Sequence, residues 1–172
     1  MRGPPLCLSV LVVLVGRPPA RPLPWVAMGR PRYDGAMDLS SEDIERLVTA
    51  ATAAREHAYA PYSRFRVGAA LLLPDSGLST GCNVENASFG LSVCAERHAV
   101  AAAVGAGARR FQALAVVTDA DPPASPCGAC RQVLSEFGDF PVILANLAGE
   151  RVVTSVSSLL PAAFDGRALD QG

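Results

Sequence analysis

The chain of 172 residues contains no lysine, few aromatic residues and no long hydrophobic run. All 15 basic residues are arginines, and residues 37–172 carry ten of them against 15 acidic residues. A domain with this negative balance attracts a phosphate backbone poorly, so we expect no nucleic acid polymer as a partner. The apolar run Leu6–Val15 is too short to span a bilayer as a helix, so we expect no membrane partner either.

Cysteine is scarce and odd in number, with five residues at Cys7, Cys82, Cys94, Cys127 and Cys130. A framework made only of disulfides would leave one of these thiols unpaired. Two of them stand only three positions apart in the sequence. The pattern favours thiolates that bind a metal in a reducing compartment, so we predict a cytoplasmic protein.

The first 36 residues differ in composition from the rest of the chain. They hold seven of the 14 prolines and five of the arginines. We interpret residues 1–36 as a disordered leader or an upstream-translated extension, and residues 37–172 as one domain. A signal peptide remains an alternative, because a basic start precedes the short apolar stretch.

Hydrophobic periodicity and turn signals predict the main elements of this domain. A helix should begin at Ser40 and end before Ala60, and two further helices should cover residues 94–104 and 127–137. Strands are predicted over residues 65–73, 78–83, 111–118, 141–146 and 151–154. This order predicts an α/β fold, with helices covering a sheet that has a parallel component.

Two short motifs carry most of the chemical information. They are Cys94-Ala95-Glu96 and Pro126-Cys127-Gly128-Ala129-Cys130. A C-x-x-C pair with a distant third thiol can hold one tetrahedral zinc ion and leave its fourth position for water. Both motifs fall at predicted helix starts, where the backbone favours a thiolate. With Glu96 placed to move protons, this is the pattern described for zinc nucleobase deaminases, in its three-cysteine variant.

A closed zinc site is the main alternative on spacing alone. His98 follows Cys94 by four residues on one helical face, so it could complete a Cys₃His site, and Cys82 is another possible fourth ligand. Such a site would make the chain a non-catalytic zinc module. Glu96 favours the open site, because a closed site has no use for a carboxylate there.

Three thiolates leave a zinc site with a net charge of −1, which opposes the acidification of a bound water. Arg97 and Arg131 each follow a ligand motif and could donate hydrogen bonds to the sulfurs. We favour this role for Arg97. For Arg131, the sequence does not distinguish a donor to the sulfurs from a solvated surface charge.

With these residues in hand, the chain resembles the homotetrameric zinc-dependent cytidine deaminases from about residue 39 to residue 169. The similar segments are Pro61–Ala70, Gly81–Ala87, Cys94–Arg97, Ser125–Gln132 and Leu159–Phe164. The resemblance implies a three-layer α/β/α fold with a central mixed sheet of about five strands. It also implies a homotetramer with active sites shared between subunits.

The resemblance implies one zinc ion per subunit, held by Cys94, Cys127 and Cys130. Glu96 would take a proton from the attacking water, pass it to N3 of the base and help protonate the leaving amine. Arg97 would donate to the ligand sulfurs. The reaction would convert cytidine and 2′-deoxycytidine, small-molecule nucleosides, to uridine and deoxyuridine, with release of ammonia.

The same resemblance implies the substrate contacts. The backbone N–H of Ala95 would bind the base O2, and the carbonyl of Ser125 would receive the amine. Asn83 and Glu85 would bind the ribose 3′-OH, and they are expected on one face of a strand. Phe65 would pack on the base, and Phe164 would reach in from a neighbouring subunit.

Two departures from the family pattern stand in the domain. Phe89 replaces an aromatic residue that is often Tyr, and His98 stands where many members have Thr. A deaminase of a nucleoside antibiotic such as blasticidin S is the nearest alternative function, since it uses the same zinc chemistry. The segment Asn83–Asn86 favours an ordinary ribose instead.

Overall fold

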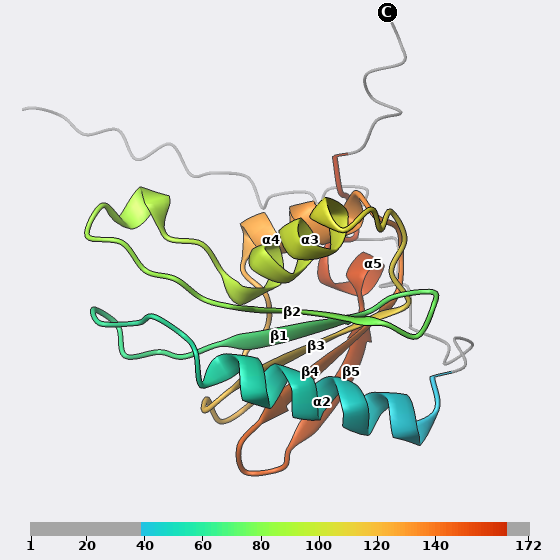
Figure 1. Ribbon diagram of the computed structural model, residues 1–172, viewed down its shortest axis with the longest axis horizontal. Helices are drawn as coiled ribbons and strands as arrows, with labels where there is room; N and C mark the ends of the chain where they lie inside the picture. Colours follow the sequence, from blue (N-terminus) through green and yellow to red (C-terminus); the bar gives the residue numbers. More distant parts are fainter. Residues whose placement is uncertain (1–38, 165–172) are drawn as a thin grey trace, which may run out of the picture.

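The computed structural model describes residues 39–164, which form a central sheet with helices on both faces (Figure 1). The strands are β1 Gly68–Leu72, β2 Leu78–Cys82, β3 Ala113–Thr118, β4 Pro141–Asn146 and β5 Arg151–Ser155. The helices are α2 Ser41–Arg55, the 3-10 helix η1 Phe89–Leu91, α3 Ala95–Gly105, α4 Gly128–Ser135 and α5 Val156–Leu159. Helix α2 lies on one face of the sheet, and α3, α4 and α5 lie on the other. The expected three-layer α/β/α fold is therefore confirmed.

The sheet is mixed, with the strand order β2-β1-β3-β4-β5. Strands β3 and β4 run parallel, and the other neighbours are antiparallel. Every residue of β3 and β4 is buried, because helices cover both faces, and this explains their continuous apolar sequences. The two strands end together at the pair Thr118 and Asn146. Ligands commonly bind beyond the carboxyl ends of parallel strands, and the loop after β3 leads to the candidate site described below.

Helix α2 begins where its sequence predicts. The Ser40 hydroxyl accepts a hydrogen bond from the Asp43 backbone N–H at 3.0 Å, which caps the first turn. The helix ends at Arg55, and the N–H groups of the next three residues bond to carbonyls three positions back. This tighter winding ends the helix before Ala60, as predicted.

Helices α3 and α4 also begin at their predicted positions, and Cys94 and Cys127 are their N-cap residues. Helix α4 ends at Ser135, two residues before the predicted end. The Phe137 N–H bonds to the Leu134 carbonyl, and Gly138 follows with a φ of 104°, a conformation that favours glycine. The chain then turns directly into β4.

The predicted strand 65–73 is wrong at its beginning, because β1 starts only at Gly68. Phe65 therefore lies in the segment before the strand. Strand β2 ends at Cys82, one residue before its predicted end, and Val84 beyond it forms isolated bridges with Tyr59 and Val93, so Asn83 and Glu85 lie just outside the strand. The Asn83 side chain bonds to the backbone of Phe65 and Val67, and the Asn83 backbone also bonds to Val67 and Tyr59, so side-chain and backbone hydrogen bonds together hold this region.

Helix α5 was not predicted, because four residues give no measurable periodicity. The Ser155 hydroxyl accepts from the Ser158 N–H at 3.1 Å and caps its start. The Leu160 N–H then bonds to the Val156 carbonyl at 3.0 Å. This short helix brings the end of the described chain back over α4.

Two glycines allow helices to pack directly on the sheet. A Cβ at Gly68 would lie 1.9 Å from the Ala51 carbonyl oxygen of α2. A Cβ at Gly81 would lie 2.5 Å from the Ala95 carbonyl oxygen and 2.5 Å from the Ala99 nitrogen, both in α3. Because α2 and α3 lie on opposite faces, these two positions fix how closely both helices approach β1 and β2.

Two hydrophobic clusters fill the space between the layers. The cluster under α2 includes Leu47, Ala51 and Ile143, and the cluster under α3 and α4 includes Leu134 and Phe140. All five side chains are at most 1% exposed. Burial of a large side chain such as Leu or Phe contributes about 1.5–3 kcal/mol, so both clusters hold the helices firmly on the sheet.

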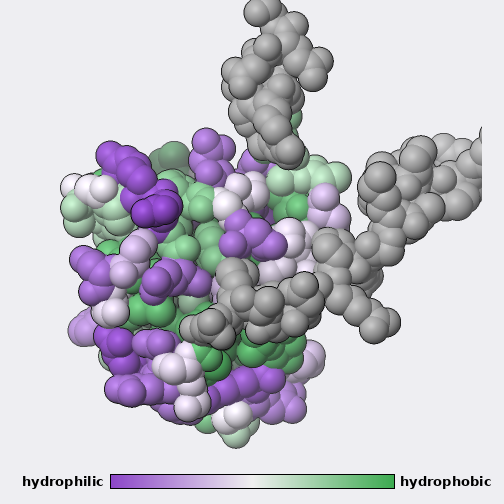
Figure 2. Space-filling model, turned by 90° about the vertical axis from the view of Figure 1, so that its right-hand side faces the viewer, coloured by the Kyte–Doolittle hydropathy of each residue, from purple (hydrophilic) through white to green (hydrophobic). Residues whose placement is uncertain are grey.

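The surface of the domain mixes hydrophilic and hydrophobic residues, as Figure 2 shows for one face. Within residues 39–164, no helix combines the length and the apolar character needed to cross a membrane. The predicted leader, residues 1–36, lies outside the described residues.

Candidate active site

Three cysteine sulfurs meet where helices α3 and α4 begin. The Cys94 and Cys127 sulfurs are 3.7 Å apart, and the Cys127 and Cys130 sulfurs are 3.6 Å apart. All three lie within 4.8 Å of one another. Tetrahedral bonds of about 2.3 Å to one zinc ion require sulfurs about 3.8 Å apart. The three residues therefore fit a zinc ion, as the sequence predicts.

The electrostatics of the three thiols favour a thiolate at Cys94. A hydrogen bond from Cys130, with smaller contributions from Arg97 and Cys127, lowers the pKa of Cys94 to about 5. The same bond to the Cys94 thiolate, together with burial, raises the pKa of Cys130 well above its usual range. The cluster thus holds one negative charge readily, and binding a metal to all three sulfurs would release protons.

Arg97 lies beside this cluster. Its Nη2 donates to the Ser92 carbonyl at 3.0 Å and lies 3.9 Å from the Cys94 sulfur. The interaction with Cys94 raises the pKa of Arg97, so its charge is secure beside the sulfur. Its Nε is buried and makes no hydrogen bond within residues 39–164. This geometry is compatible with the predicted role of Arg97 in balancing the negative sulfurs.

His98 and Cys82 do not join the cluster. The only group of three or more metal-binding side chains in the described part of the chain consists of Cys94, Cys127 and Cys130. The His98 Nδ1 lies 2.8 Å from the Cys82 carbonyl oxygen. His98 thus contacts the end of β2, and the closed Cys₃His site receives no support from the structure.

The Glu96 side chain is held out of water near the sulfurs. It lies in the first turn of α3, and the residue is only 4% exposed. Burial raises its pKa above the ordinary value of 4.5. A buried carboxyl group with a raised pKa is suited to accept a proton and return it within one reaction cycle.

A cavity of about 190 Å³ opens beside the cluster. It brings together seven of the predicted site residues, which are Phe65, Asn83, Glu85, Cys94, Glu96, Ser125 and Cys127. Val116 and Thr118 from β3 line it as well. The cavity therefore joins residues from both predicted motif regions, although they are far apart in the sequence.

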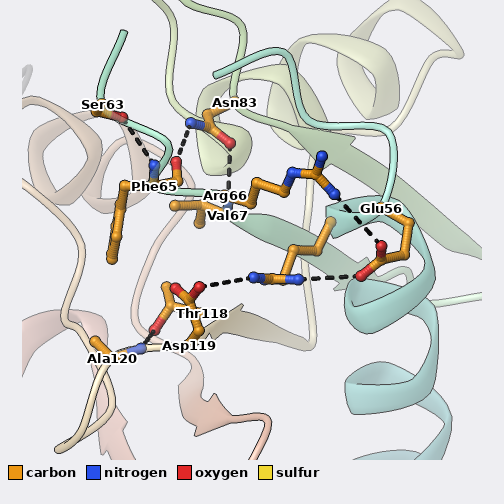
Figure 3. A network of polar contacts seen from close by, with 10 residues as sticks. Glu56, Ser63, Phe65, Arg66, Val67, Asn83, Thr118, Asp119 and Ala120 are labelled. Atoms are coloured by element: carbon orange, nitrogen blue, oxygen red, sulfur yellow. Dashed lines mark hydrogen bonds and ion pairs between the residues drawn. The ribbon is translucent and has the colours of Figure 1, made fainter. Parts of the chain in front are cut away.

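One wall of the cavity is held by side-chain hydrogen bonds to the backbone, which Figure 3 shows for Ser63, Phe65, Val67 and Asn83. The Val67 N–H donates to the Asn83 Oδ1 at 2.8 Å, and the Asn83 Nδ2 donates to the Phe65 carbonyl at 2.8 Å. The Ser63 hydroxyl accepts from the Phe65 N–H at 3.0 Å. These contacts fix the position of the Phe65 side chain at the cavity.

Glu85 completes this wall. Its carboxylate accepts from the backbone N–H groups of Tyr62 and Ser63, at 2.9 and 3.2 Å, and from the Ser63 hydroxyl. The hydroxyl of Ser63 is the main cause that lowers the pKa of Glu85 below 4.5. No role was predicted for Ser63, although it lies in the segment Pro61–Ala70 that resembles the family.

Ala95 and Phe164, which were also predicted as site residues, and Phe89 do not line the 190 Å³ cavity. Ala95 is fully buried at the start of α3. Phe164 is 61% exposed, and its carbonyl accepts from the Gln132 Nε2 at 2.7 Å. Phe89 is 74% exposed and contacts Tyr62 edge to face, with ring centroids 5.9 Å apart.

Comparison with known proteins agrees with the geometry. Residues 41–146 match the family described as the cytidine and deoxycytidylate deaminase zinc-binding region, so the site is that of a zinc-dependent deaminase. A cytidine deaminase of Sporosarcina psychrophila is 53% identical over 124 residues, which are 71% of this chain and 91% of that protein. The chain belongs to the cytidine deaminase family.

A solved structure supports the same conclusion. The crystal structure of a cytidine deaminase from Burkholderia pseudomallei is 54% identical, with a TM-score of 0.68. The match covers 70% of this chain and 98% of that one. A blasticidin-S deaminase of Bacillus cereus is more distant, at 28% identity over 132 residues, 72% of this chain and 93% of that protein. The cytidine deaminase interpretation is therefore favoured over the antibiotic deaminase.

Proposed function

We propose that the protein catalyses the hydrolytic deamination of cytidine and 2′-deoxycytidine to uridine and 2′-deoxyuridine, releasing ammonia for pyrimidine salvage. The observation that carries this proposal is a buried carboxyl group, Glu96, that lines one cavity with Cys94 and Cys127, two members of the cluster of three thiols. Water adds its oxygen to C4 of the base, the bond from C4 to the exocyclic nitrogen breaks, and ammonia leaves.

Cys94, Cys127 and Cys130 would hold the zinc ion. Bound there, zinc supplies the Lewis acidity that makes a water molecule nucleophilic at neutral pH. Glu96 takes a proton from the attacking water and delivers it to N3, and later helps protonate the leaving amine. Its low exposure keeps bulk water from competing for that proton.

Two backbone groups orient the base. Ala95 is the first residue of α3, so no carbonyl of its own helix accepts its N–H, and this group can donate to the base O2. Ser125 lies in the loop before α4, and its carbonyl accepts the leaving amine. Both groups belong to segments that also carry a zinc ligand, so the base and the metal are positioned together.

The wall of Phe65, Asn83 and Glu85 holds the rest of the nucleoside. Phe65 is 39% exposed and can pack on the base. Asn83 and Glu85 bind the ribose 3′-OH. Because ribose and deoxyribose share this hydroxyl, we expect both nucleosides to react.

We also propose that the protein is a homotetramer in which neighbouring subunits complete each active site. Several large apolar side chains are exposed on the single subunit, namely Tyr59, Tyr62, Val84, Phe89, Leu91 and Phe164. Phe164 would enter the site of a neighbouring subunit. Burial of these residues between subunits would remove apolar surface that is unusual for a monomer.

Reduced thiols and a nucleoside substrate are compatible with the cytoplasm, where we place the enzyme. We place the functional domain at residues 37–172 and treat residues 1–36 as a leader or extension. Sequencing the amino terminus of the native protein tests that division. A mature terminus near Met37 supports it.

An absorbance assay tests the proposed reaction. Purified protein is incubated with cytidine, 2′-deoxycytidine or blasticidin S, and the loss of the cytosine absorbance is followed. We expect turnover of the two nucleosides and little of the antibiotic. Glu96→Gln should lower kcat by about 10²–10⁴-fold and retain zinc. Turnover that survives this substitution contradicts the role of Glu96.

A further inference from the structure

The loop between β3 and α4, residues 119–127, carries two groups that the proposed function needs. Ser125 lines the cavity, and Cys127 is a member of the thiol cluster. The loop contains no helix or strand, so no ladder of backbone hydrogen bonds fixes it. The hydrogen bonds that hold it to the rest of the domain lie near its two ends.

The start of the loop is held by an arginine from the opposite face of the sheet. Arg55, the last residue of α2, donates from Nη2 to the Asp119 carboxylate at 3.0 Å and from Nη1 to the Glu56 carboxylate at 3.0 Å. Figure 3 shows Asp119 and Glu56 joined through this one side chain. The Arg55 side chain is only 8% exposed, so these two carboxylates, and not bulk water, balance its positive charge.

Asp119 is covalently next to Thr118, whose side chain lines the cavity. The Thr118 hydroxyl accepts from the Ala120 N–H at 3.3 Å, and the Ala120 carbonyl accepts from the Asn146 Nδ2 at 3.3 Å. The bond from Arg55 to Asp119 therefore acts together with these bonds at the point where the chain leaves β3.

The end of the loop is held by an arginine of α4. Arg131 donates from Nε to the Pro126 carbonyl at 2.8 Å and from Nη1 to the Leu159 carbonyl at 3.0 Å. Its Nη2 donates to the Ser125 hydroxyl. One guanidinium thus joins the two residues before Cys127 to the end of α5. All these acceptors are oxygens, so Arg131 acts on the loop and not on the ligand sulfurs.

We propose that Arg55 and Arg131 are positioning residues that hold the loop of residues 119–127 at its two ends, so that Ser125 and Cys127 keep their places at the cavity. The inference rests on the proposed deamination, in which the Ser125 carbonyl receives the leaving amine. Loosening either end moves that carbonyl away from the departing group. The chemical step then slows, while the wall of Phe65, Asn83 and Glu85 still binds the nucleoside.

The test compares kcat and KM for cytidine, with kcat expressed per bound zinc. Asp119→Asn removes the charge that Arg55 meets, at nearly constant size, and Arg131→Gln removes the branched donor. We expect kcat to fall about tenfold in the first variant and up to about 100-fold in the second, the range that a small misplacement of a reacting group can cost. KM should stay within about twofold of the original value.

Conservative variants and a matched control separate positioning from general destabilisation. Asp119→Glu and Arg131→Lys keep the charges and should recover most of the lost kcat. Glu45→Gln breaks another ion pair of α2, with Arg151 of β5, where the Glu45 Oε2 lies 2.9 Å from the arginine. This control should leave kcat and KM unchanged. Hydrogen exchange of residues 119–127 should quicken in Asp119→Asn and not in Glu45→Gln.

Three results would overturn the inference: kcat per zinc unchanged in both loop variants, an equal loss of kcat in Glu45→Gln, or unchanged exchange in the loop. Failure of the unsubstituted protein to deaminate cytidine would instead contradict the proposed function. The exchange measurement needs no substrate, so it tests whether Arg55 holds the loop even if the protein does not deaminate cytidine.

Discussion

The cavity has two walls that are built in different ways. The thiol wall consists of Cys94, Glu96 and Cys127, together with the buried Cys130 of the same thiol cluster, and it stands on helix starts that pack against the sheet. The loop wall consists of Ser63, Phe65, Asn83 and Glu85, outside any helix or strand. Glu96 is 4% exposed, whereas Phe65 is 39% exposed. Regular elements therefore hold the residues that we assign to the chemistry. Side-chain hydrogen bonds and isolated backbone bridges hold those that we assign to nucleoside binding.

The comparison suggests that the two walls fail in different ways. Damage to the thiol wall should affect kcat and metal content, because its residues act on the reacting atoms. Damage to the loop wall should affect KM first, because its residues contact parts of the nucleoside that do not react. The following experiments test this division.

Removal of the metal should have the largest effect. A chelator should abolish turnover completely and lower the melting temperature, since a ligand present at 100 times its Kd stabilises a protein by about 2.7 kcal/mol. Zinc added back should restore both. Calorimetry and the absorbance assay measure the two effects. Turnover in metal-free protein would contradict the role of the thiol wall.

Arg97→Ala should have the next largest effect. The arginine lies 3.9 Å from the Cys94 sulfur, and loss of a group that supports a metal ligand costs about 10–100-fold in activity or metal affinity. We expect kcat to fall more than zinc content, because the ligand sulfurs would keep more negative charge. Arg97→Lys is the matched control and should retain part of the activity. An unchanged kcat in Arg97→Ala would show that this charge has no effect.

Asn83→Ala should disturb the loop wall and leave the thiol wall intact. The substitution removes two side-chain hydrogen bonds to the backbone, each contributing about 0.5–1.5 kcal/mol. KM for cytidine should rise about tenfold, with full zinc content and a smaller change in kcat. Asn83→Asp keeps the acceptor for the Val67 N–H and should show a smaller loss of stability. A change confined to kcat would contradict the division between the walls.

Ser63→Ala should have the smallest effect. The Ser63 hydroxyl is the main cause that holds the pKa of Glu85 below 4.5, so the substitution should raise that pKa toward 4.5. A lowered pKa in the folded protein gives stability that is present above pH 4.5 and is lost as the pH falls through the folded value. The variant should therefore lose this contribution, which NMR titration of the Glu85 carboxyl group can detect. An unchanged pKa would show that Ser63 does not control Glu85.

The thiol wall could be predicted from the sequence, and the loop wall only in part. The C-x-x-C spacing at a helix start requires both sulfurs to share a face, so local geometry alone brings Cys127 and Cys130 together. The strand containing Phe65 was predicted too long, and Asn83 was placed on a strand. Hydrophobic patterning does not show that the Asn83 side chain bonds to the backbone of Val67 and Phe65, since these partners are 16 and 18 residues away.

The two arginines at the loop ends illustrate a second limit. Arg131 was considered as a donor to the sulfurs, and its neighbour Cys130 made that plausible. In the structure its donors reach the Pro126 and Leu159 carbonyls, and Leu159 belongs to the short helix α5 that no periodicity predicts. The contact of Arg55 with the loop could not be predicted from the sequence, because its partner Asp119 is 64 residues away along the chain. Contacts of this kind depend on the topology of the whole sheet.

The absence of a side chain at Gly81 limits which substitutions this enzyme can accept. The helix that carries Glu96 rests on that residue without any intervening atom, since even a methyl group there would meet the helix backbone at 2.5 Å. Any larger residue would lift the start of α3 and carry the carboxyl group away from the thiols. The position of the carboxyl group that we propose as catalytic thus depends on a neighbouring strand that contributes no residue to the site. We expect the protein to tolerate no other residue at position 81.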